Sequence, residues 1–188
     1  MPPDSTATKA RLLDAASAEF TRYGIAGARV DRIAEQAKAN KRLIYVYFGN
    51  KDELFDIVLA RSTAAISDLV PFTPEDLPDY AVRLFDALLV NQDVLRLNAW
   101  RQLERPLTAA ERMADLAYKQ APLAAAQQAG ALDAGLDPED LLILVIGLAM
   151  AWFTHFGSAV AESVHDEAAR VSRHREAIRE AVRRLVGG

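Results

Sequence analysis

Residues 30–48 read VDRIAEQAKANKRLIYVYF, and this stretch decides the fold that the sequence predicts. Its first part repeats apolar residues at the i, i+3, i+4, i+7 spacing of one helix face, which predicts a short helix. A turn follows at Lys38 and Ala39, and Asn40 is a good N-cap for a second helix that continues to about Tyr47. The apolar positions of the first helix are Val30, Ile33, Ala34 and Ala37.

The second helix carries two kinds of side chain. Ile44 and Phe48 lie one turn apart and can face inward, which leaves the cations and other side chains between them on the outside. Cations bind phosphate, arginine can donate two hydrogen bonds to guanine, and valine can contact a thymine methyl group. The outward row consists of Lys41, Arg42, Tyr45 and Val46. The stretch therefore predicts a helix-turn-helix motif whose second helix reads DNA.

A set of apolar, aromatic, small and charged residues, in the motif and on both sides of it, holds one fixed register. They stand at Arg11 to Ala16, Phe20, Tyr23, Gly24, Val30, Ile33, Ala34, Ala37, Ile44, Tyr45, Tyr47, Phe48 and Lys51 to Leu54. In order and spacing they resemble the N-terminal DNA-binding domain of the tetracycline-repressor (TetR) family, over about residues 6–58. Each position alone is a weak signal, whereas a dozen in one register are specific.

Two positions depart from the family's pattern. Lys38 stands where the family usually has a turn glycine, and Arg29 stands where Ser or Thr usually caps the first helix of the motif. A non-glycine residue with positive φ costs on the order of 1 kcal/mol, so the turn is either slightly strained or built differently. Both replacements are cationic, which suits a DNA surface.

Composition and charge agree with a DNA-binding protein. The 188 residues are 51% hydrophobic and contain no cysteine, which describes a globular chain without disulfides or thiolate zinc sites and fits a cytoplasmic location. The net charge is −4, yet residues 22–51 contain seven cations and two acids, a net charge of +5. A basic patch on an acidic body is the footprint of a modest DNA-binding surface. Charge alone would favour a plain solvated face, and DNA binding becomes the better interpretation only in combination with the motif.

Helical signals continue through the chain and predict an all-α protein of about nine helices. Ser5 and its neighbours can cap a first helix that ends at Gly24 and has Leu12, Leu13, Ala16 and Phe20 on its apolar stripe. Asn50 with Glu53 forms a capping box for a fourth helix, whose candidates for burial are Leu54, Phe55, Ile57, Val58, Ile66 and Leu69. Three prolines between 71 and 78 mark a linker, and Pro122 should kink a later helix. The later helices are expected over about 77–91, 94–104, 108–129, 138–153 and 165–185. Asp137 is the expected N-cap of the helix that begins at 138, with proline at its first position.

The run from Leu141 to Phe153 has thirteen residues without a polar side chain. It is shorter than the roughly 20 residues that a membrane-spanning helix needs, so we expect a buried helix and no membrane. A helix that is apolar all round must be covered on every side, which one small domain cannot do at an outer position. We therefore expect the last two helices to form a homodimer interface, a four-helix bundle across a two-fold axis.

No constellation for catalysis or metal binding is visible in the sequence. His155, His165 and His174 are ten and nine residues apart, so no two share a helical turn as metal ligands. The acids are scattered or serve as helix caps, and no glycine-rich phosphate loop occurs. We expect neither an enzyme nor a cofactor.

The resemblance implies a one-component transcriptional regulator, in TetR proteins most often a repressor. Residues 1–50 would form a three-helix DNA-binding domain, and residues 51–188 a helical domain for dimerisation and effector binding. The partners would be a near-palindromic DNA operator and a small, largely apolar effector that releases the protein from DNA. The alternative is a helical regulator or interaction module whose C-terminal half only dimerises and binds no small ligand.

Candidate site residues follow from the motif and from the aromatic residues. For base edges we expect Lys41, Arg42, Tyr45 and Val46, although Tyr45 would also suit the core. For phosphates we expect Arg29, Lys38, Tyr47 and Lys51, although Lys51 could be plain surface charge. An effector pocket could be lined by Phe85, Leu97, Trp100, Tyr118, Trp152 and Phe156, with Arg101 or His155 supplying polarity. Aromatic residues at helical spacing can equally be plain core.

Overall fold

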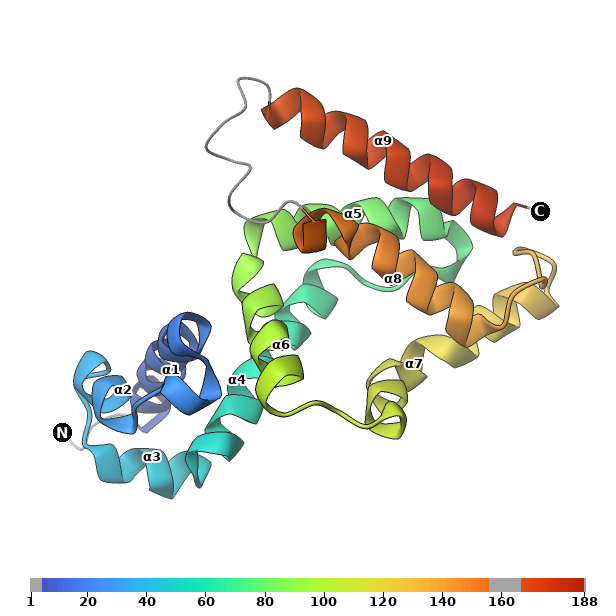
Figure 1. The fold of residues 1–188 in the computed structure, drawn as a ribbon. Coiled ribbons are helices and arrows are strands. Elements are labelled where there is room, and N and C mark those ends of the chain that lie inside the picture. Colours follow the sequence, from blue (N-terminus) through green and yellow to red (C-terminus); the bar gives the residue numbers. More distant parts are fainter. Residues whose placement is uncertain (1–4, 156–166, 188) are drawn as a thin grey trace. The chain divides into compact units, whose positions relative to one another are not determined.

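A computed structural model describes residues 5–155 and 167–187, and over these residues the protein is all-α, as predicted (Figure 1). Nine α-helices and one short 3-10 helix make up the described fold. The helices are α1 (Ser5–Gly27), α2 (Val30–Gln36), α3 (Lys41–Phe48), α4 (Lys51–Leu69), η1 (Pro74–Asp76), α5 (Leu77–Val90), α6 (Gln92–Glu104), α7 (Ala109–Gln128), α8 (Pro138–His155) and α9 (Glu167–Val186).

The chain divides into two compact units. The N-terminal unit consists of Met1–Ala65 with Asn91–Thr108, and the C-terminal unit consists of Ile66–Val90 with Ala109–Gly188. The chain therefore leaves the N-terminal unit within α4, builds α5 in the C-terminal unit, and returns with α6. The predicted division into a DNA-binding domain of residues 1–50 and an effector-binding and dimerisation domain of residues 51–188 stays a prediction. It concerns the roles of the residues, whereas the two compact units are defined by contacts alone.

The core of the N-terminal unit is built from one face of each of its helices. The predicted stripe of α1 is buried at Leu12, Ala16 and Phe20, and only Leu13 is partly exposed. The ring of Phe20 meets that of Phe55 edge to face, with 5.2 Å between ring centroids. In α4 we expected Ile57 and Leu69 to be buried, and this was wrong. Both side chains are exposed, because the core face of the helix is taken by its other apolar residues.

Gly24 ends the regular part of α1, as predicted, and lets another helix approach closely. Its φ of 70° lies in the left-handed region, and hydrogen-bonded turns continue beyond it only as far as Gly27. A Cβ atom at this position would collide with the Glu104 carboxylate and would lie 2.8 Å from the Trp100 ring. Glycine is therefore required both for the backbone conformation and for the contact with α6.

Three polar contacts hold α6 in the N-terminal unit. The indole Nε1 of Trp100 donates to the Thr21 carbonyl oxygen at 3.2 Å, and Glu104 Oε2 accepts from the Ala26 backbone N–H at 2.6 Å. Just after α6, Arg105 pairs with both carboxylate oxygens of Asp56 on α4, at 3.0 and 3.1 Å. This bidentate hydrogen bonding raises the pKa of Arg105. Leu97 completes the attachment by entering the core.

Glu19 joins α1 to the start of α2. The residue is only 5% exposed, and its Oε1 accepts from the backbone N–H of Arg29 at 2.8 Å and from Arg32 Nε at 2.7 Å. The hydrogen bond from Arg32 raises the pKa of that guanidinium, which also stacks 4.3 Å from the centroid of the Tyr23 ring. Arg29 itself makes no side-chain cap on α2. A carboxylate of α1 therefore binds a backbone N–H at the start of α2, where the family's Ser or Thr cap is missing.

The C-terminal unit is built around α5, which packs along α8 and α9. The ring of Phe85 is fully buried and meets Trp152 of α8 at 6.2 Å and His174 of α9 at 5.1 Å between centroids. The start of α8 follows the prediction, because Asp137 Oδ1 accepts from the Glu139 N–H at 2.8 Å. In the described part of the chain, no helix is both long enough and apolar enough to cross a membrane.

The Glu19 contacts generate a prediction about stability. The change Glu19→Ala leaves the N–H of Arg29 without its acceptor and the partly buried Arg32 without its carboxylate. It should lower the free energy of unfolding by about 2 kcal/mol. Urea unfolding at fixed protein concentration measures this loss. The matched control is Glu35→Ala, which removes an exposed acid of α2 and should change stability by less than about 0.5 kcal/mol. Equal losses for the two variants would contradict the role given to Glu19.

Candidate DNA-binding surface

The turn between α2 and α3 keeps the family's geometry and is therefore strained at Lys38, rather than being built in a different way. Lys38 has a φ of 50°, and its N–H donates to the Glu35 carbonyl oxygen at 3.0 Å. The N–H of Ala39 donates to the Ala34 carbonyl oxygen, also at 3.0 Å. These two bonds form the Schellman arrangement that usually has glycine in the left-handed position. Lys38 thus keeps the turn at a conformational cost on the order of 1 kcal/mol.

The N-cap of α3 and the side of the helix that is buried are both as predicted. Asn40 Oδ1 accepts from the Arg42 backbone N–H at 2.8 Å, which caps the helix. Ile44 and Phe48 are buried in the core of the N-terminal unit, so the opposite face of α3 points to solvent. The side chains on that face are Lys41, Arg42, Tyr45 and Val46, with Tyr45 50% and Val46 64% exposed. Tyr45 is therefore not a core residue.

One cation of this face has an internal partner. Lys41 Nζ lies 2.7 Å from Asp31 Oδ1 of α2, and the pair raises the pKa of the lysine and lowers that of the aspartate. Both side chains are exposed, so the pair adds little stability. Arg42 makes no ion pair with any residue that the structure describes. The charge of Arg42 is thus open to a ligand, whereas that of Lys41 is shared with Asp31.

The expected phosphate-binding residues have different surroundings. Arg29 and Lys38 are exposed. Tyr47 is half-buried, and Lys9 Nζ lies 4.9 Å from the centroid of its ring. Lys51 is also half-buried, and its Nζ donates to the carbonyl oxygens of residues 26 and 28 at 3.4 and 3.3 Å. Lys51 is therefore more than plain surface charge, because it fastens the loop before α2 to the start of α4.

The capping box at the start of α4 is confirmed. Asn50 Oδ1 accepts from the backbone N–H groups of Asp52 and Glu53 at 2.8 and 3.0 Å, and Glu53 Oε2 accepts from the Asn50 N–H at 2.7 Å. Gly49 has a φ of 76°, and a Cβ atom there would collide with the Glu53 carboxylate. The chain thus turns sharply from α3 into α4 and brings Lys51 beside the motif.

Two residues that position the motif were missed by sequence reasoning. Glu19 binds the start of α2, and Arg11 Nε donates to the Ala37 carbonyl oxygen at the end of the same helix, at 3.2 Å. A signal for Glu19 was present, because it lies three residues after Ala16 and next to Phe20, within the apolar stripe of α1. A charged residue in such a stripe needs a partner. Arg11 was part of the register that resembles the TetR family, but nothing in the sequence indicated its contact with the end of α2.

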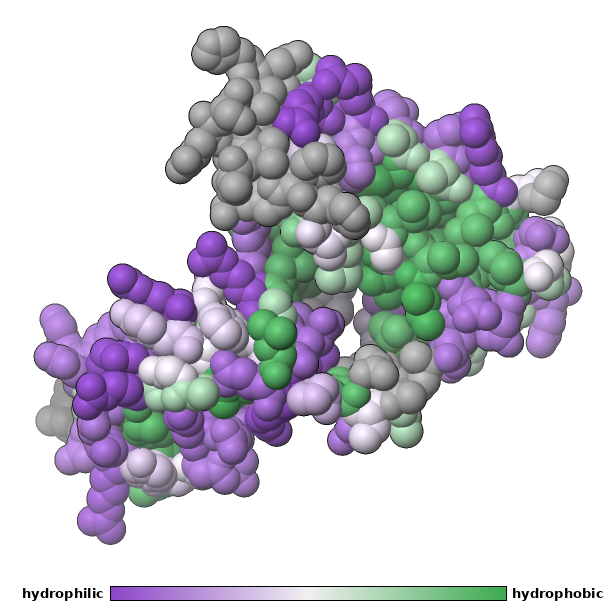
Figure 2. Space-filling model, in the orientation of Figure 1, coloured by the Kyte–Doolittle hydropathy of each residue, from purple (hydrophilic) through white to green (hydrophobic). Residues whose placement is uncertain are grey.

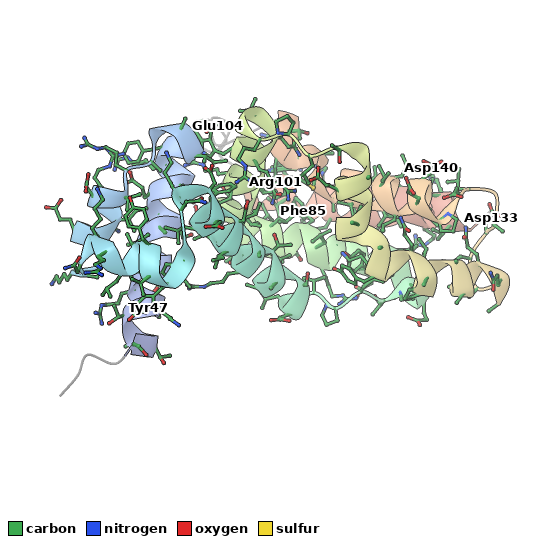
Figure 3. All side chains as sticks on the ribbon, turned by 90° about the horizontal axis from the view of Figure 1, so that it is seen from below. Tyr47, Phe85, Arg101, Glu104, Asp133 and Asp140 are labelled. Atoms are coloured by element: carbon green, nitrogen blue, oxygen red, sulfur yellow. The ribbon has the colours of Figure 1, made fainter. Side chains whose placement is uncertain are left out.

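The expected effector residues are distributed over both units. Phe85 and Trp152 meet in the C-terminal unit, where they contact His174, whose pKa is lowered by burial. Leu97, Trp100 and Arg101 belong to α6 of the N-terminal unit, and Figure 3 labels Arg101 on α6 and Phe85 on α5. The remaining three residues of the expected set are Tyr118, which is exposed on α7, His155, whose side chain is not described, and Phe156, which lies outside the described residues.

The described residues contain no cluster of side chains that could bind a metal ion. Within residues 5–155 and 167–187, no three side chains of His, Cys, Asp or Glu gather as a metal site would require. What the N-terminal unit presents instead is a capped, well-supported helix with cations and an exposed tyrosine and valine along its outer face. That arrangement suits insertion into a DNA major groove.

Comparison with known proteins identifies both parts of the chain. Residues 12–58 match the sequence family described as bacterial regulatory proteins of the tetR family, and residues 76–184 match the tetracyclin repressor-like C-terminal domain. The HTH-type transcriptional repressor SCO4008 of Streptomyces coelicolor is 42% identical over 150 residues, which cover 78% of each chain. The HTH-type transcriptional repressor NicS of Pseudomonas putida is 38% identical over 72 residues, 38% of this chain and 34% of NicS.

A solved structure extends the likeness to nearly the whole chain. The crystal structure of SCO4942, described as a transcriptional regulator of Streptomyces coelicolor, has a TM-score of 0.81 and is 39% identical in sequence. The match covers 95% of this chain and 98% of that one. The chain therefore belongs to the tetR family and is a helix-turn-helix, DNA-binding regulator of transcription, not an enzyme.

Proposed function

We propose that the protein represses transcription by binding a near-palindromic operator as a homodimer and that a small, largely apolar effector releases it. The observation that carries this proposal is the outer face of α3, where Arg42 is exposed and makes no ion pair with the described residues. A two-fold dimer would insert its two α3 helices into successive major grooves, at half-sites about 34–36 Å apart. Selection of bound sequences from random DNA at fixed salt tests this directly, since a folded dimer that enriches no near-palindrome would refute it.

We propose a division of labour among the cations. Lys41 and Arg42 would contact base edges together with Tyr45 and Val46, because these side chains point away from the buried face of α3. Arg29, Lys38, Tyr47 and Lys51 would contact phosphates, because they flank the motif at the starts and ends of its helices. Base contacts specify the sequence, whereas phosphate contacts fix the orientation of the protein on the duplex.

Two substitutions separate these roles. Arg42→Ala should weaken operator binding by about 1–3 kcal/mol and relax one operator position. Lys51→Ala should weaken operator and random DNA alike and reduce the salt dependence of binding. Titration of operator and random DNA at several salt concentrations measures the two effects. Because Lys51→Ala also removes hydrogen bonds to two backbone carbonyls, thermal unfolding of each variant shows whether a loss of stability contributes to the loss of binding. If each variant loses the same binding free energy on operator DNA as on random DNA, the proposed division between base and phosphate contacts is wrong.

The Lys41–Asp31 pair should restrain DNA binding. Asp31→Asn removes the partner of Lys41 and frees its charge for DNA, so affinity for any duplex should rise by up to about fivefold. The control Glu35→Gln removes another exposed acid of α2 that has no such pairing among the described residues. Fluorescence anisotropy at low salt compares the two variants. A gain no larger than that of the control would show that only net charge matters.

We propose that dimerisation uses α8 and α9. Ile143 and Leu144 of α8 are 43% and 44% exposed, and Figure 2 shows apolar side chains gathered over this helix. Apolar surface of this kind on a helix is the usual core of a homodimer interface. The outer side of α9 is charged, and several of its ion pairs, such as Arg183 with Glu180, lie within the helix, whereas Arg175 pairs with Asp86 of α5. Such a side suits the rim of an interface better than its centre.

A charge placed on α8 tests the dimer. Leu144→Lys would put a cation at the centre of the proposed interface, where it could find no water and no partner. It should convert the dimer to a monomer at micromolar concentration in sedimentation experiments and weaken operator binding at least tenfold. Leu69→Lys is the matched control, since Leu69 is 62% exposed and lies on α4. A Leu144→Lys variant that remains dimeric would rule out α8.

For the effector we propose a site in the C-terminal unit that includes Phe85 and Trp152. Their edge-to-face contact and the neighbouring His174 supply apolar surface with one polar ring, the composition of many small-molecule sites. To release DNA, the effector must bind the DNA-incompetent state more tightly than the competent one. Titration of effector candidates against the protein–operator complex tests this proposal by release of the DNA.

A further inference from the structure

A groove of about 280 Å³ lies within the N-terminal unit, between α1 and α6. It is open to solvent and close to the lower end of the size range of ligand sites, so it fits a molecule on the order of a dozen non-hydrogen atoms. The groove is lined by Thr21 and Arg22 of α1 and by Arg96, Ala99, Trp100 and Leu103 of α6. None of the residues proposed to contact DNA lines it.

The two arginines of the groove have no counter-ion among the described residues. Arg22 and Arg96 are both exposed, and neither forms an ion pair with any part of the chain that the structure describes. Arg22 lies 5.2 Å from the centroid of the Tyr23 ring, which leaves its N–H groups available. Glu104 is not among the lining residues, and its Oε2 accepts from the Ala26 N–H at 2.6 Å. Two guanidinium groups in one small groove favour an anion, and each can donate two parallel hydrogen bonds to a carboxylate.

The remaining lining is apolar and partly fixed. Trp100 is held in place by its hydrogen bond to the Thr21 carbonyl oxygen, so its ring offers a preformed flat surface. Leu103 is 76% exposed, although it lies beside this ring in the groove. The hydroxyl oxygen of Thr21 is buried and has no hydrogen-bond partner among the described residues, an arrangement that costs free energy until a partner is found.

We propose that this groove binds a small organic anion with a flat apolar body, such as an aromatic carboxylate. The carboxylate would lie between Arg22 and Arg96, and the ring system would cover Trp100 and Leu103. The site is separate from the effector site proposed around Phe85, and it does not depend on the DNA-binding role of α3. Because the ligand would contact both α1 and α6, its binding would strengthen the attachment of α6.

The two tryptophans allow a test that reports on each location separately. The probe is 2-naphthoate, and 2-naphthamide has the same shape without the charge. Proton–nitrogen correlation spectra of the full-length protein contain one indole N–H signal each for Trp100 and Trp152, assigned with the variant Trp152→Phe. We expect naphthoate to shift the Trp100 signal saturably, and the amide to bind at least tenfold more weakly.

Substitution of the arginines completes the experiment. Arg96→Gln and Arg22→Gln should each weaken naphthoate binding about tenfold and leave amide binding unchanged, because each removes a charged hydrogen-bond donor. The control Arg61→Gln removes a cation from the same unit that is already paired with Asp14, and it should leave both affinities unchanged.

Three outcomes would overturn the proposal. A shift of the Trp152 signal alone would place the probe in the C-terminal unit. Equal affinity for naphthoate and naphthamide would make the groove an unselective apolar surface. Naphthoate binding that survives both Arg→Gln changes would remove the anion-binding role of the arginines. Each of these results is independent of operator binding, so failure of this proposal and failure of the proposed DNA-binding function are distinguishable.

Discussion

The N-terminal unit depends on one buried carboxylate. Glu19 is almost fully removed from water, and a buried charge is costly unless it is paired and hydrogen-bonded. The N–H of Arg29 and the guanidinium of Arg32 satisfy it together, and this requirement fixes the start of α2 against α1. With α2 fixed, burial of Ile44 and Phe48 in the common core sets the rotation of α3. The face that the protein presents to DNA thus follows from an interaction that itself touches no DNA.

The same principle explains why the motif tolerates its two unusual residues. Arg29 lacks a capping oxygen, but Glu19 supplies one from another helix. Lys38 adopts a left-handed conformation, but the hydrogen bonds of the turn and the one from Arg11 to Ala37 hold that conformation. At both positions the residue with the better local conformational preference is replaced by one that adds a positive charge beside the proposed DNA surface. Each such residue costs about 1 kcal/mol of stability, and tertiary contacts can compensate for a cost of this size.

The helix α6 shows most clearly where sequence reasoning ran out. Periodicity predicted its existence, and its aromatic and charged residues suggested an effector pocket together with Phe85 and Trp152. In the structure, Gly24 opens a space on α1 that Trp100 and Glu104 fill, so that α6 belongs to the N-terminal unit. No pattern within α6 encodes this partner, because the complementary feature is a missing side chain some 75 residues earlier.

By itself the sequence determined the all-α class, the helix-turn-helix motif, the caps at Asn40, Asn50 and Asp137, and the outward face of α3. These features are local, because they depend on spacings of three or four residues along one helix or on a side chain that bonds its own backbone neighbours. Only the tertiary structure decided the partners of Glu19, the unit to which α6 belongs, the exposure of Ile57 and Leu69, and the groove beside Trp100. Those features join residues far apart in the chain, and a pattern along one helix cannot specify which other helix will cover it.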